Sequence, residues 1–365
     1  MRVQLVDPSA YTPPYDRALA SALARAGAQV ELVTSRFAYG EVPAADGYAV
    51  RELFYRRALG APGSRLRRTA KLAQHVPDML RWRALAGGAD VVHLQWLTAP
   101  LLDQALLPDR PLVLTAHDLL PREPRPGQAW AQRRLLARAD AVIVHSRYGR
   151  AQLVQRLGIP TDRVSVIHHG AFTPAAPSAL PPEMEAHDTG EPVVLFAGLL
   201  RPYKGLDTLL DAWRGIDGAQ LWIAGRPMLD LAPLRARATS SVRFVARFVS
   251  DGELAALLAR ADVVVLPYAR TERFDQSGAL SSALGHGRAI VASDVGGFSE
   301  VAALGAARLV APGDPAALRE ALGDVLSDPA ARARLAAAAL HAASGPLSWD
   351  AAARATLALY ERVTA

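Results

Sequence analysis

The residues best suited to chemistry in this chain are two cations, Arg201 and Lys204, in one short turn. The turn follows an apolar run at residues 193–196; Gly198 stands at its start, and a helical pattern begins near Gly205. A glycine lets a ligand approach the backbone, and a helix start offers unpaired N–H groups and a positive dipole end. These features predict a diphosphate site. The alternative is an ordinary strand-to-helix turn with two solvated basic residues.

Lysine is rare in this chain, since only two of its 41 basic residues are lysines. A compact ammonium on a flexible stem meets a phosphate as a point charge, where a planar guanidinium fits badly. We therefore interpret Lys204 as a residue that a site requires. Lys71 lies in an arginine-rich stretch without a motif, and we interpret it as a compositional remnant.

A second anion-ready turn follows the apolar run at residues 263–268. Gln276, Ser277 and Gly278 precede an amphipathic helical pattern at 279–284, so the backbone N–H groups of Ser277 and Gly278 are expected to face an anion. The alternative interpretation is that Asp275 and Ser277 are helix caps only.

The elements that must position these turns are parallel strands joined by helices. Short apolar runs alternate with longer amphipathic segments, a pattern typical of doubly wound α/β sheets, which bind ligands beyond the carboxyl ends of their strands. The expected strands are residues 2–6, 30–34, 91–94, 112–115, 141–145, 164–167, 193–196, 220–224, 242–245, 263–267, 289–293 and 307–310. We expect an N-terminal domain at 1–175, a Pro-rich linker at 176–191, a C-terminal domain at 192–346 and a last helix at 347–365.

Composition narrows the function further. The chain has 365 residues, half of them apolar, no cysteine and a formal charge of +6, with a net +9 in residues 1–180 and −3 in the remainder. The absence of cysteine excludes disulfides and thiolate catalysis. No motif of a nucleic-acid-binding fold occurs, so we expect no nucleic-acid partner. No apolar run approaches the ~20 residues of a membrane helix, and we expect a cytoplasmic protein.

Motifs spread over nearly the whole chain resemble retaining GT-B glycosyltransferases of family GT4 (glycosyl transferases group 1). The matching stretches are Phe196-Ala197-Gly198-x-x-Arg201-x-x-Lys204-Gly205, Leu221-Trp222-Ile223-Ala224-Gly225, residues 261–267, residues 287–297, Asp90-Val91-Val92-His93, His117-Asp118 and Ser348-Trp349.

The resemblance implies a GT-B fold: two doubly wound Rossmann-like domains facing a central cleft, with a C-terminal helix that crosses back to the first domain. It implies an acceptor-binding first domain and a second domain that binds a nucleoside diphosphate sugar. Arg201 and Lys204 would hold the donor diphosphate, and His117 would reach the transferred sugar, although a lone histidine can also be structural. The remaining donor-binding candidates are Gly198, Gln276, Ser277, Gly278, Arg226, Arg247 and Phe248.

The first turn, residues 7–16, lacks the glycine pair of many relatives, and its aromatic and hydroxyl groups suit acceptor binding. The acceptor candidates are Tyr11, Thr12 and Asp16, with N-capping as the alternative role of Asp16, Thr12 and Ser9.

This chain departs from the family at two glutamates, whose positions hold Phe274 and Ser282. The triplet Gln276–Gly278 occurs in some members instead, and Glu272 and Asp275 are acidic candidates for the ribose. No Asp-x-Asp triplet or histidine cluster occurs, so metal-independent transfer is expected, with no cofactor beyond the donor. UDP, GDP and dTDP remain open. The alternatives are a catalytically silent nucleotide-sugar-binding subunit and a GT-B epimerase or phosphorylase.

The acceptor remains open among a small molecule, a glycan and a lipid-linked glycan. The stretch at residues 65–83 is basic, helical in pattern and carries Trp82. Such a helix can lie on anionic lipid, which would place the protein at the inner face of the membrane. The alternative is a solvated helix face that covers the first sheet.

Overall fold

The computed structural model describes residues 1–40, 42–119, 127–271 and 276–365, and these divide into two compact units. Unit 1 contains Met1–His168 together with Trp349–Ala365, and unit 2 contains the described residues between His169 and Ser348. Each unit is built around one parallel sheet with helices on both faces, which confirms the doubly wound α/β architecture expected from the sequence.

The sheet of unit 1 has seven parallel strands in the order β3-β2-β1-β4-β5-β6-β7. The strand order reverses between β1 and β4, and the carboxyl ends of strands at such a point form the usual ligand site. The strands are β1 (Arg2–Asp7), β2 (Gln29–Ser35), β3 (Ala49–Phe54), β4 (Val91–Leu94), β5 (Leu112–Thr115), β6 (Ala141–Val144) and β7 (Val164–Val166).

Strand β3 is the one strand of this sheet that the sequence did not predict; the other six are confirmed to within one residue at either end. Its sequence, Ala-Val-Arg-Glu-Leu-Phe, has neither an apolar run nor strict alternation, and most of its residues are exposed. An edge strand pairs on one side only, so its residues need not be apolar, and the pattern on which strand prediction depends is weak there.

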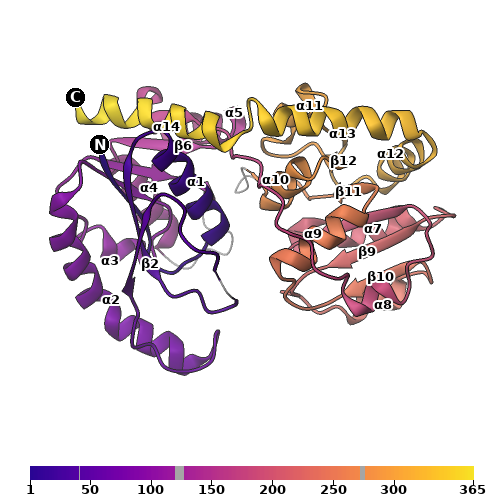
Figure 1. Cartoon of the computed structure of the whole chain (residues 1–365), viewed down its shortest axis with the longest axis horizontal. Helices are drawn as coiled ribbons and strands as arrows, with labels where there is room; N and C mark the ends of the chain where they lie inside the picture. Colours follow the sequence, from indigo (N-terminus) through magenta and orange to yellow (C-terminus); the bar gives the residue numbers. More distant parts are fainter. Residues whose placement is uncertain (41, 120–126, 272–275) are drawn as a thin grey trace. The chain divides into compact units, whose positions relative to one another are not determined.

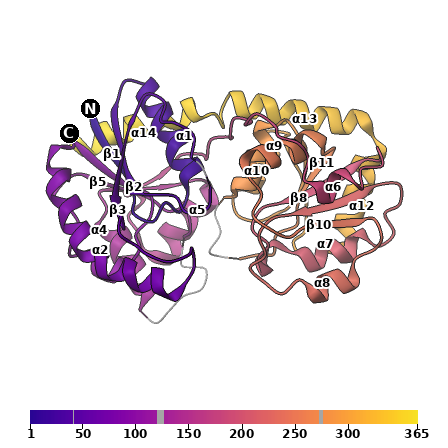
Figure 2. The ribbon, with the colours of Figure 1, turned by 60° about the horizontal axis from the view of Figure 1, so that its bottom comes forward.

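Helices cover both faces of this sheet (Figure 2). On one face, α2 (Arg65–Leu85) and α4 (Gln128–Arg138) pack on apolar strand residues, with Met79, Trp82 and Leu135 at the centre of the cluster. On the other face, α1 (Pro13–Arg25) lies beside α14 (Trp349–Thr364), and Figure 1 shows the two helices together. The shorter segments are η1 (Ala86–Gly88), α3 (Pro100–Asp103), α5 (Arg147–Ala151), η2 (Gln152–Arg156) and η3 (Thr161–Arg163).

A buried hydrogen-bonded group joins α14 to the sheet. His93 of β4 contacts the Tyr360 hydroxyl through Nδ1 at 2.6 Å and the Thr115 hydroxyl through Nε2 at 2.7 Å. Burial lowers the pKa of His93 to about 3, so its ring is neutral and both nitrogens are hydrogen-bonded. The last helix of the chain is therefore part of the core of unit 1.

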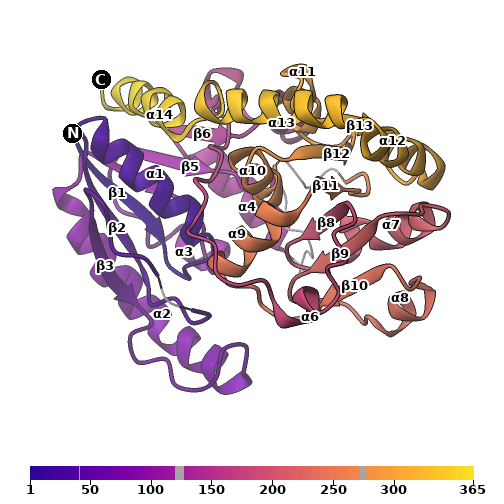
Figure 3. The ribbon, with the colours of Figure 1, turned by 45° about the vertical axis from the view of Figure 1, so that its right-hand side comes forward.

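The sheet of unit 2 has six parallel strands in the order β10-β9-β8-β11-β12-β13, and its order reverses between β8 and β11. Figure 3 shows β8, β9 and β10 side by side. All six strands were predicted to within one residue at either end: β8 (Val193–Ala197), β9 (Gln220–Ala224), β10 (Val242–Val245), β11 (Val263–Leu266), β12 (Ala289–Ser293) and β13 (Arg308–Val310).

Three helices of unit 2 begin at residues whose side chains cap them. Ser250 and Glu253 form a capping box at the start of α9, and Asp314 and Asp328 cap α12 and α13. The helical segments are α6 (Pro182–Glu185), η4 (Pro202–Lys204), α7 (Leu206–Trp213), α8 (Ala232–Arg237), α9 (Asp251–Arg260), α10 (Gly278–Gly285), α11 (Phe298–Ala303), α12 (Pro315–Ser327) and α13 (Pro329–Ser344). In the described ranges of the chain, no helix is both long and apolar enough to cross a membrane.

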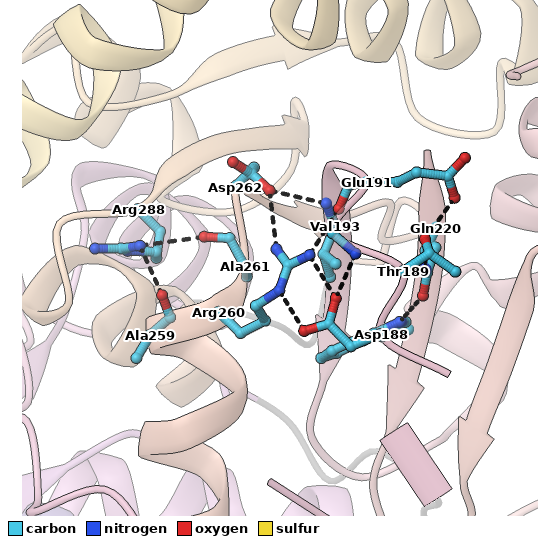
Figure 4. A network of polar contacts seen from close by, with 12 residues as sticks. Asp188, Thr189, Glu191, Val193, Gln220, Ala259, Arg260, Ala261, Asp262 and Arg288 are labelled. Carbon is cyan, nitrogen blue, oxygen red and sulfur yellow. Dashed lines mark hydrogen bonds and ion pairs between the residues drawn. The ribbon is translucent and has the colours of Figure 1, made fainter. Parts of the chain in front are cut away.

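A polar network ties the segment before β8 to the strands of unit 2 (Figure 4). Arg260 donates two hydrogen bonds of 2.7 Å to the carboxylate of Asp188. It donates another to the Glu191 carbonyl oxygen. Asp262 accepts the Val193 N–H at 2.9 Å, at the first residue of β8. Residues 188–191, which the sequence assigned to the linker, are thus bonded to unit 2.

Candidate functional site

Lys204 is buried at the carboxyl end of the unit 2 sheet, beside the point where its strand order reverses. Only 7% of the residue is exposed. Its ammonium lies 5.1 Å from the ring centre of Tyr268, which follows β11, and 5.9 Å from that of Phe196 in β8. The quadrupoles of two aromatic rings favour a cation in this position. The structure therefore places the predicted lysine where a doubly wound sheet binds its ligand.

Two glycines shape this turn around the lysine. Gly198 has a φ of +121°, and a Cβ on it would lie 2.9 Å from Lys204 Nζ. Gly205 has a φ of +71°, and a Cβ there would lie 1.8 Å from the Pro267 carbonyl oxygen. Any other residue at these positions would displace the ammonium or push apart the ends of β8 and β11.

Arg201 shares the turn and carries a buried donor. Its Nε is buried and has no hydrogen-bond partner within the described part of the chain. A buried donor without a partner costs about 1–3 kcal/mol, and a ligand that accepts its hydrogen bond would remove that cost. Arg201 and Lys204 together offer two positive charges and several donors to an anion.

Ser277 lies opposite this turn and faces Tyr268. It precedes the first residue of α10, but its side chain makes no capping bond; its hydroxyl lies 3.0 Å from the Tyr268 hydroxyl. The Ser277 N–H instead donates to Gln276 Oε1 at 3.0 Å. Ser277 thus occupies the N-cap position of α10, as the alternative interpretation expected, but its side chain does not cap the helix. Gly278 begins α10, whereas Glu272, Phe274 and Asp275 lie outside the described residues.

The other donor candidates lie after the neighbouring strands. Arg226 follows β9 and is exposed. Arg247, beyond β10, forms ion pairs with Glu253 at 2.7 Å and Glu183 at 3.1 Å. These hydrogen bonds raise the pKa of Arg247 and lower the pKa of Glu253 to about 2, and Phe248 beside them is exposed. The guanidinium of Arg247 is thus engaged by carboxylates.

In unit 1 a buried pair of acids occupies the end of β1. Asp7 accepts hydrogen bonds from the N–H groups of Ser9, Tyr11 and Thr12. Asp16, in α1, is hydrogen-bonded to Asp7, and burial followed by the charge of Asp7 raises the pKa of Asp16 well above its usual value. We infer that Asp16 retains its proton and donates a hydrogen bond to Asp7.

The three predicted acceptor residues are brought together with Trp96, which follows β4. Tyr11 is 66% exposed, and its ring centre lies 5.0 Å from that of Trp96. The Thr12 hydroxyl accepts from Trp96 Nε1 at 2.9 Å and donates to Asp16 at 3.3 Å. An aromatic pair of an exposed tyrosine and a half-buried tryptophan, beside hydroxyl and carboxyl groups, can hold a polyhydroxylated ring.

His117 follows β5, and its half-buried ring is held from several sides. It stacks on Trp96 with ring centres 5.2 Å apart and planes inclined by 12°, and it meets Tyr15 edge to face at 4.6 Å. Its Nε2 lies 2.9 Å from Gln95 Oε1, and its Nδ1 lies 3.4 Å from Nε2 of His145. His145 is neutral because burial lowers its pKa to about 4.

Gln95, Trp96 and Tyr268 are site residues that the sequence interpretation missed. Each lies within two residues of the carboxyl end of a strand, Gln95 and Trp96 after β4 and Tyr268 after β11. Gln95 Nε2 is buried without a hydrogen-bond partner among the residues described. The signal that points to His117, a polar residue just beyond the carboxyl end of a strand, is present at Gln95 as well.

Within the described ranges, no group of three or more His, Asp or Glu side chains is arranged to hold a metal ion.

Comparison with protein families gives two matches. Residues 191–328 match Glycosyl transferases group 1, and residues 17–173 match Glycosyltransferase Family 4. A D-inositol 3-phosphate glycosyltransferase of Xylanimonas cellulosilytica is 30% identical, with 95% of this chain and 90% of that protein covered. An alpha-maltose-1-phosphate synthase of Mycolicibacterium smegmatis is 30% identical, with coverages of 77% and 81%.

Solved structures share the fold. Sucrose-phosphate synthase from Thermosynechococcus elongatus superposes with a TM-score of 0.77 at 22% identity, over 100% of this chain and 99% of that one. Anabaena HepE in complex with UDP-glucose gives a TM-score of 0.75 at 19% identity, over 99% and 100%.

Proposed function

The chain belongs to the glycosyl transferases of group 1, family GT4, and from this premise we propose that it is a retaining, metal-independent glycosyltransferase. The donor is a nucleoside diphosphate sugar, and the product is a glycoside of an acceptor hydroxyl. The glycosyltransferase names of the relatives and the GT-B fold of the structural neighbours support the class of reaction.

The observation that carries the proposal is the turn of Gly198, Arg201 and Lys204. It puts a buried ammonium and an unpartnered guanidinium nitrogen, the latter counted within the described residues, at the carboxyl ends of β8 and β11. A diphosphate accepts hydrogen bonds from both cations. Their charges stabilise the negative charge that develops on the leaving diphosphate, and fixed charges in a site of low polarity do this without reorganisation.

The proposed reaction needs no side-chain base. The bond between the anomeric carbon and the diphosphate oxygen breaks, and the acceptor oxygen bonds to the same face of that carbon. The acceptor proton passes to the departing phosphate oxygen. Arg201 and Lys204 hold that phosphate, and Ser277 and Gly278 would orient the donor from the start of α10.

We assign acceptor binding to the end of β1 in unit 1. Tyr11 and Thr12 are held by Trp96, and the Asp7–Asp16 pair fixes the backbone of the turn. His117 is the candidate for contact with the transferred sugar, because Trp96, Tyr15 and Gln95 hold its ring in one orientation.

The test is calorimetric titration of the whole chain with UDP, GDP and dTDP, followed by transfer and hydrolysis assays with the matching sugars. One nucleotide is expected to bind, and Lys204→Met to weaken it about tenfold or more, because it removes a charge-assisted hydrogen bond. Arg235→Met, on exposed α8, is the control. A protein that binds none of the nucleotides, or that Lys204→Met leaves unaffected, would contradict the proposal.

Membrane contact through α2 and a location at the inner membrane face stay predictions. The helix exposes Leu66, Leu72 and Leu80 among arginines, as a lipid-facing helix does. Sedimentation with vesicles rich in phosphatidylglycerol tests this, and Leu66→Glu with Leu80→Glu is expected to abolish it.

A further inference from the structure

A basic pocket of about 140 Å³ lies in unit 1 between the end of β1, the end of β2 and the start of α2. Four cations line it: Arg36 from the segment after β2, and Arg67, Arg68 and Lys71 from α2. None of the described residues that line it is acidic. The volume is several times the ~30 Å³ share of one water molecule in the liquid.

Among the described residues, none of these four cations takes part in an ion pair. Burial, followed by the charge of Arg67, lowers the pKa of Lys71. The opposite charge that acts on Lys71 is that of Asp7, which partly offsets the effects of burial and of Arg67 on its pKa. Like charges gathered around a partly enclosed space repel one another, and a bound anion removes that repulsion.

The side chain of Lys71 packs over the ring of Tyr55 and does not extend freely into solvent. Its ammonium lies 4.6 Å from the ring centre of Tyr55, whose hydroxyl is bonded to His75 Nδ1 at 2.7 Å. His75 is bonded in turn to the buried Asp103. A cation positioned by its neighbours loses less side-chain entropy on binding than a free surface lysine.

Backbone strain is concentrated at the same place. Ala10 and Tyr55 have φ values of +49° and +55°, and they are the only residues other than glycine with positive φ in the described part of the chain. Ala10 lines the pocket, and Tyr55 lies beneath Lys71. Left-handed conformations of such residues cost roughly 1–2 kcal/mol and cluster at ligand sites.

We propose that this pocket binds a phosphate monoester, and that the phosphate is carried by the acceptor. An arginine guanidinium can donate two parallel hydrogen bonds to two phosphate oxygens, and a lysine ammonium can pair with a third. Together these groups suit the three oxygens of a terminal phosphate. Ser9 lines the pocket and bonds through its hydroxyl to Thr98 at 2.9 Å, and its N–H donates to Asp7. The pocket thus adjoins the turn to which the proposed function assigns the acceptor, and the second half of the proposal rests on that assignment.

The experiment measures binding of inorganic phosphate, glycerol 3-phosphate and glycerol to the whole chain by calorimetry. The protein is first saturated with the nucleotide that it binds, so that phosphate cannot enter the turn of Lys204. Glycerol 3-phosphate is expected to bind and glycerol not. Lys71→Met and Arg68→Met are each expected to weaken glycerol 3-phosphate about tenfold. Arg83→Met, on the exposed face of the same helix, is expected to change it less than twofold.

Equal weakening by Lys71→Met, Arg68→Met and Arg83→Met would show attraction by net charge alone and would overturn the proposal, as would no binding of either phosphate. Nucleotide affinity is measured in the same variants. If the nucleotide binds and the phosphates do not, the pocket is excluded and the proposed transferase function stands. If no nucleotide binds but Lys71 governs phosphate affinity, the pocket stands and the function fails.

Vesicles identify the source of the phosphate. Phosphatidic acid presents the same phosphate monoester on a lipid surface, whereas phosphatidylglycerol presents a diester. Competition by soluble glycerol 3-phosphate against phosphatidic acid vesicles supports one pocket that serves both. Equal binding to both vesicle types, unaffected by Lys71→Met, would assign lipid attraction to the outer face of α2 and exclude the pocket from it.

Discussion

At the scale of single residues, the site in unit 2 depends on the shape of a lysine as much as on its charge. The Lys204 ammonium fits between the Gly198 backbone, the Tyr268 ring and the Phe196 ring. A guanidinium is wider and planar, and Gly198 has no side chain whose removal could make room for it.

Lys204→Arg is therefore expected to reduce sugar transfer by about 100-fold, although it keeps the positive charge. The larger guanidinium would shift the positive charge by roughly one bond length or more. A shift of about 1 Å in a group that positions the substrate is enough for a loss of this size. Initial rates with the preferred nucleotide sugar give the measurement. Rates near those of the unmodified chain would show that charge alone is sufficient.

His117→Gln is expected to lower transfer about 10- to 100-fold and to leave nucleotide affinity unchanged. The ring is positioned by Trp96 and Gln95 in unit 1, while the predicted diphosphate ligands belong to unit 2. The separation of kcat from nucleotide Kd distinguishes this role from a structural one. An equal loss in both, or a lower melting temperature that accounts for the loss, would contradict a role in contact with the sugar.

At the scale of elements, Asp7 and Asp16 fix the turn from β1 to α1. The free energy of unfolding should therefore depend on pH, and the direction of this dependence follows from the pKa of Asp16. The folded protein raises the pKa of Asp16 well above its unfolded value of 3.8. The folded state therefore holds the proton to higher pH than the unfolded chain. The stabilisation is complete below pH 3.8 and is lost as the pH rises through the folded-state pKa.

Asp16→Asn keeps a hydrogen-bond donor for Asp7 and cannot ionise. The variant is expected to gain stability relative to the unmodified protein as the pH rises above 3.8 and through the raised folded-state pKa of Asp16. Urea unfolding at intervals across this range measures the difference. Parallel stability curves for the two proteins would mean that Asp16 does not hold the proton.

Elements with strong hydrophobic patterns were predictable from the sequence, and those defined by pairing alone were not. Twelve strands were expected from apolar runs, and all twelve are present, whereas the exposed edge strand β3 was missed. The cations Arg201 and Lys204 were found through local spacing. The partners of Lys204 and Lys71 were not, because Tyr268 and Tyr55 reach them through the fold rather than along the chain.

At the scale of the molecule, unit 1 is completed by a helix from the other end of the chain. Tyr360→Phe would leave His93 Nδ1 in the core without the hydroxyl that it contacts, at a cost of about 1–3 kcal/mol. We expect a lower melting temperature for unit 1 and an unchanged nucleotide affinity, since Tyr360 belongs to unit 1. Arg362→Ala, on an exposed part of α14, is the control. An equal change in melting temperature in both variants would show that the buried contact between Tyr360 and His93 does not stabilise the protein.

The place of α14 in unit 1 also sets an order of events during synthesis. The ribosome makes Met1–His168 first, but these residues must wait for Trp349–Ala365 before Tyr15 can meet Trp349 and His93 can meet Tyr360. Unit 2 is translated in the meantime, and its sheet needs nothing that is made later. The second half of the protein can thus reach its folded state on the ribosome before the first, the reverse of the order usual for successive domains.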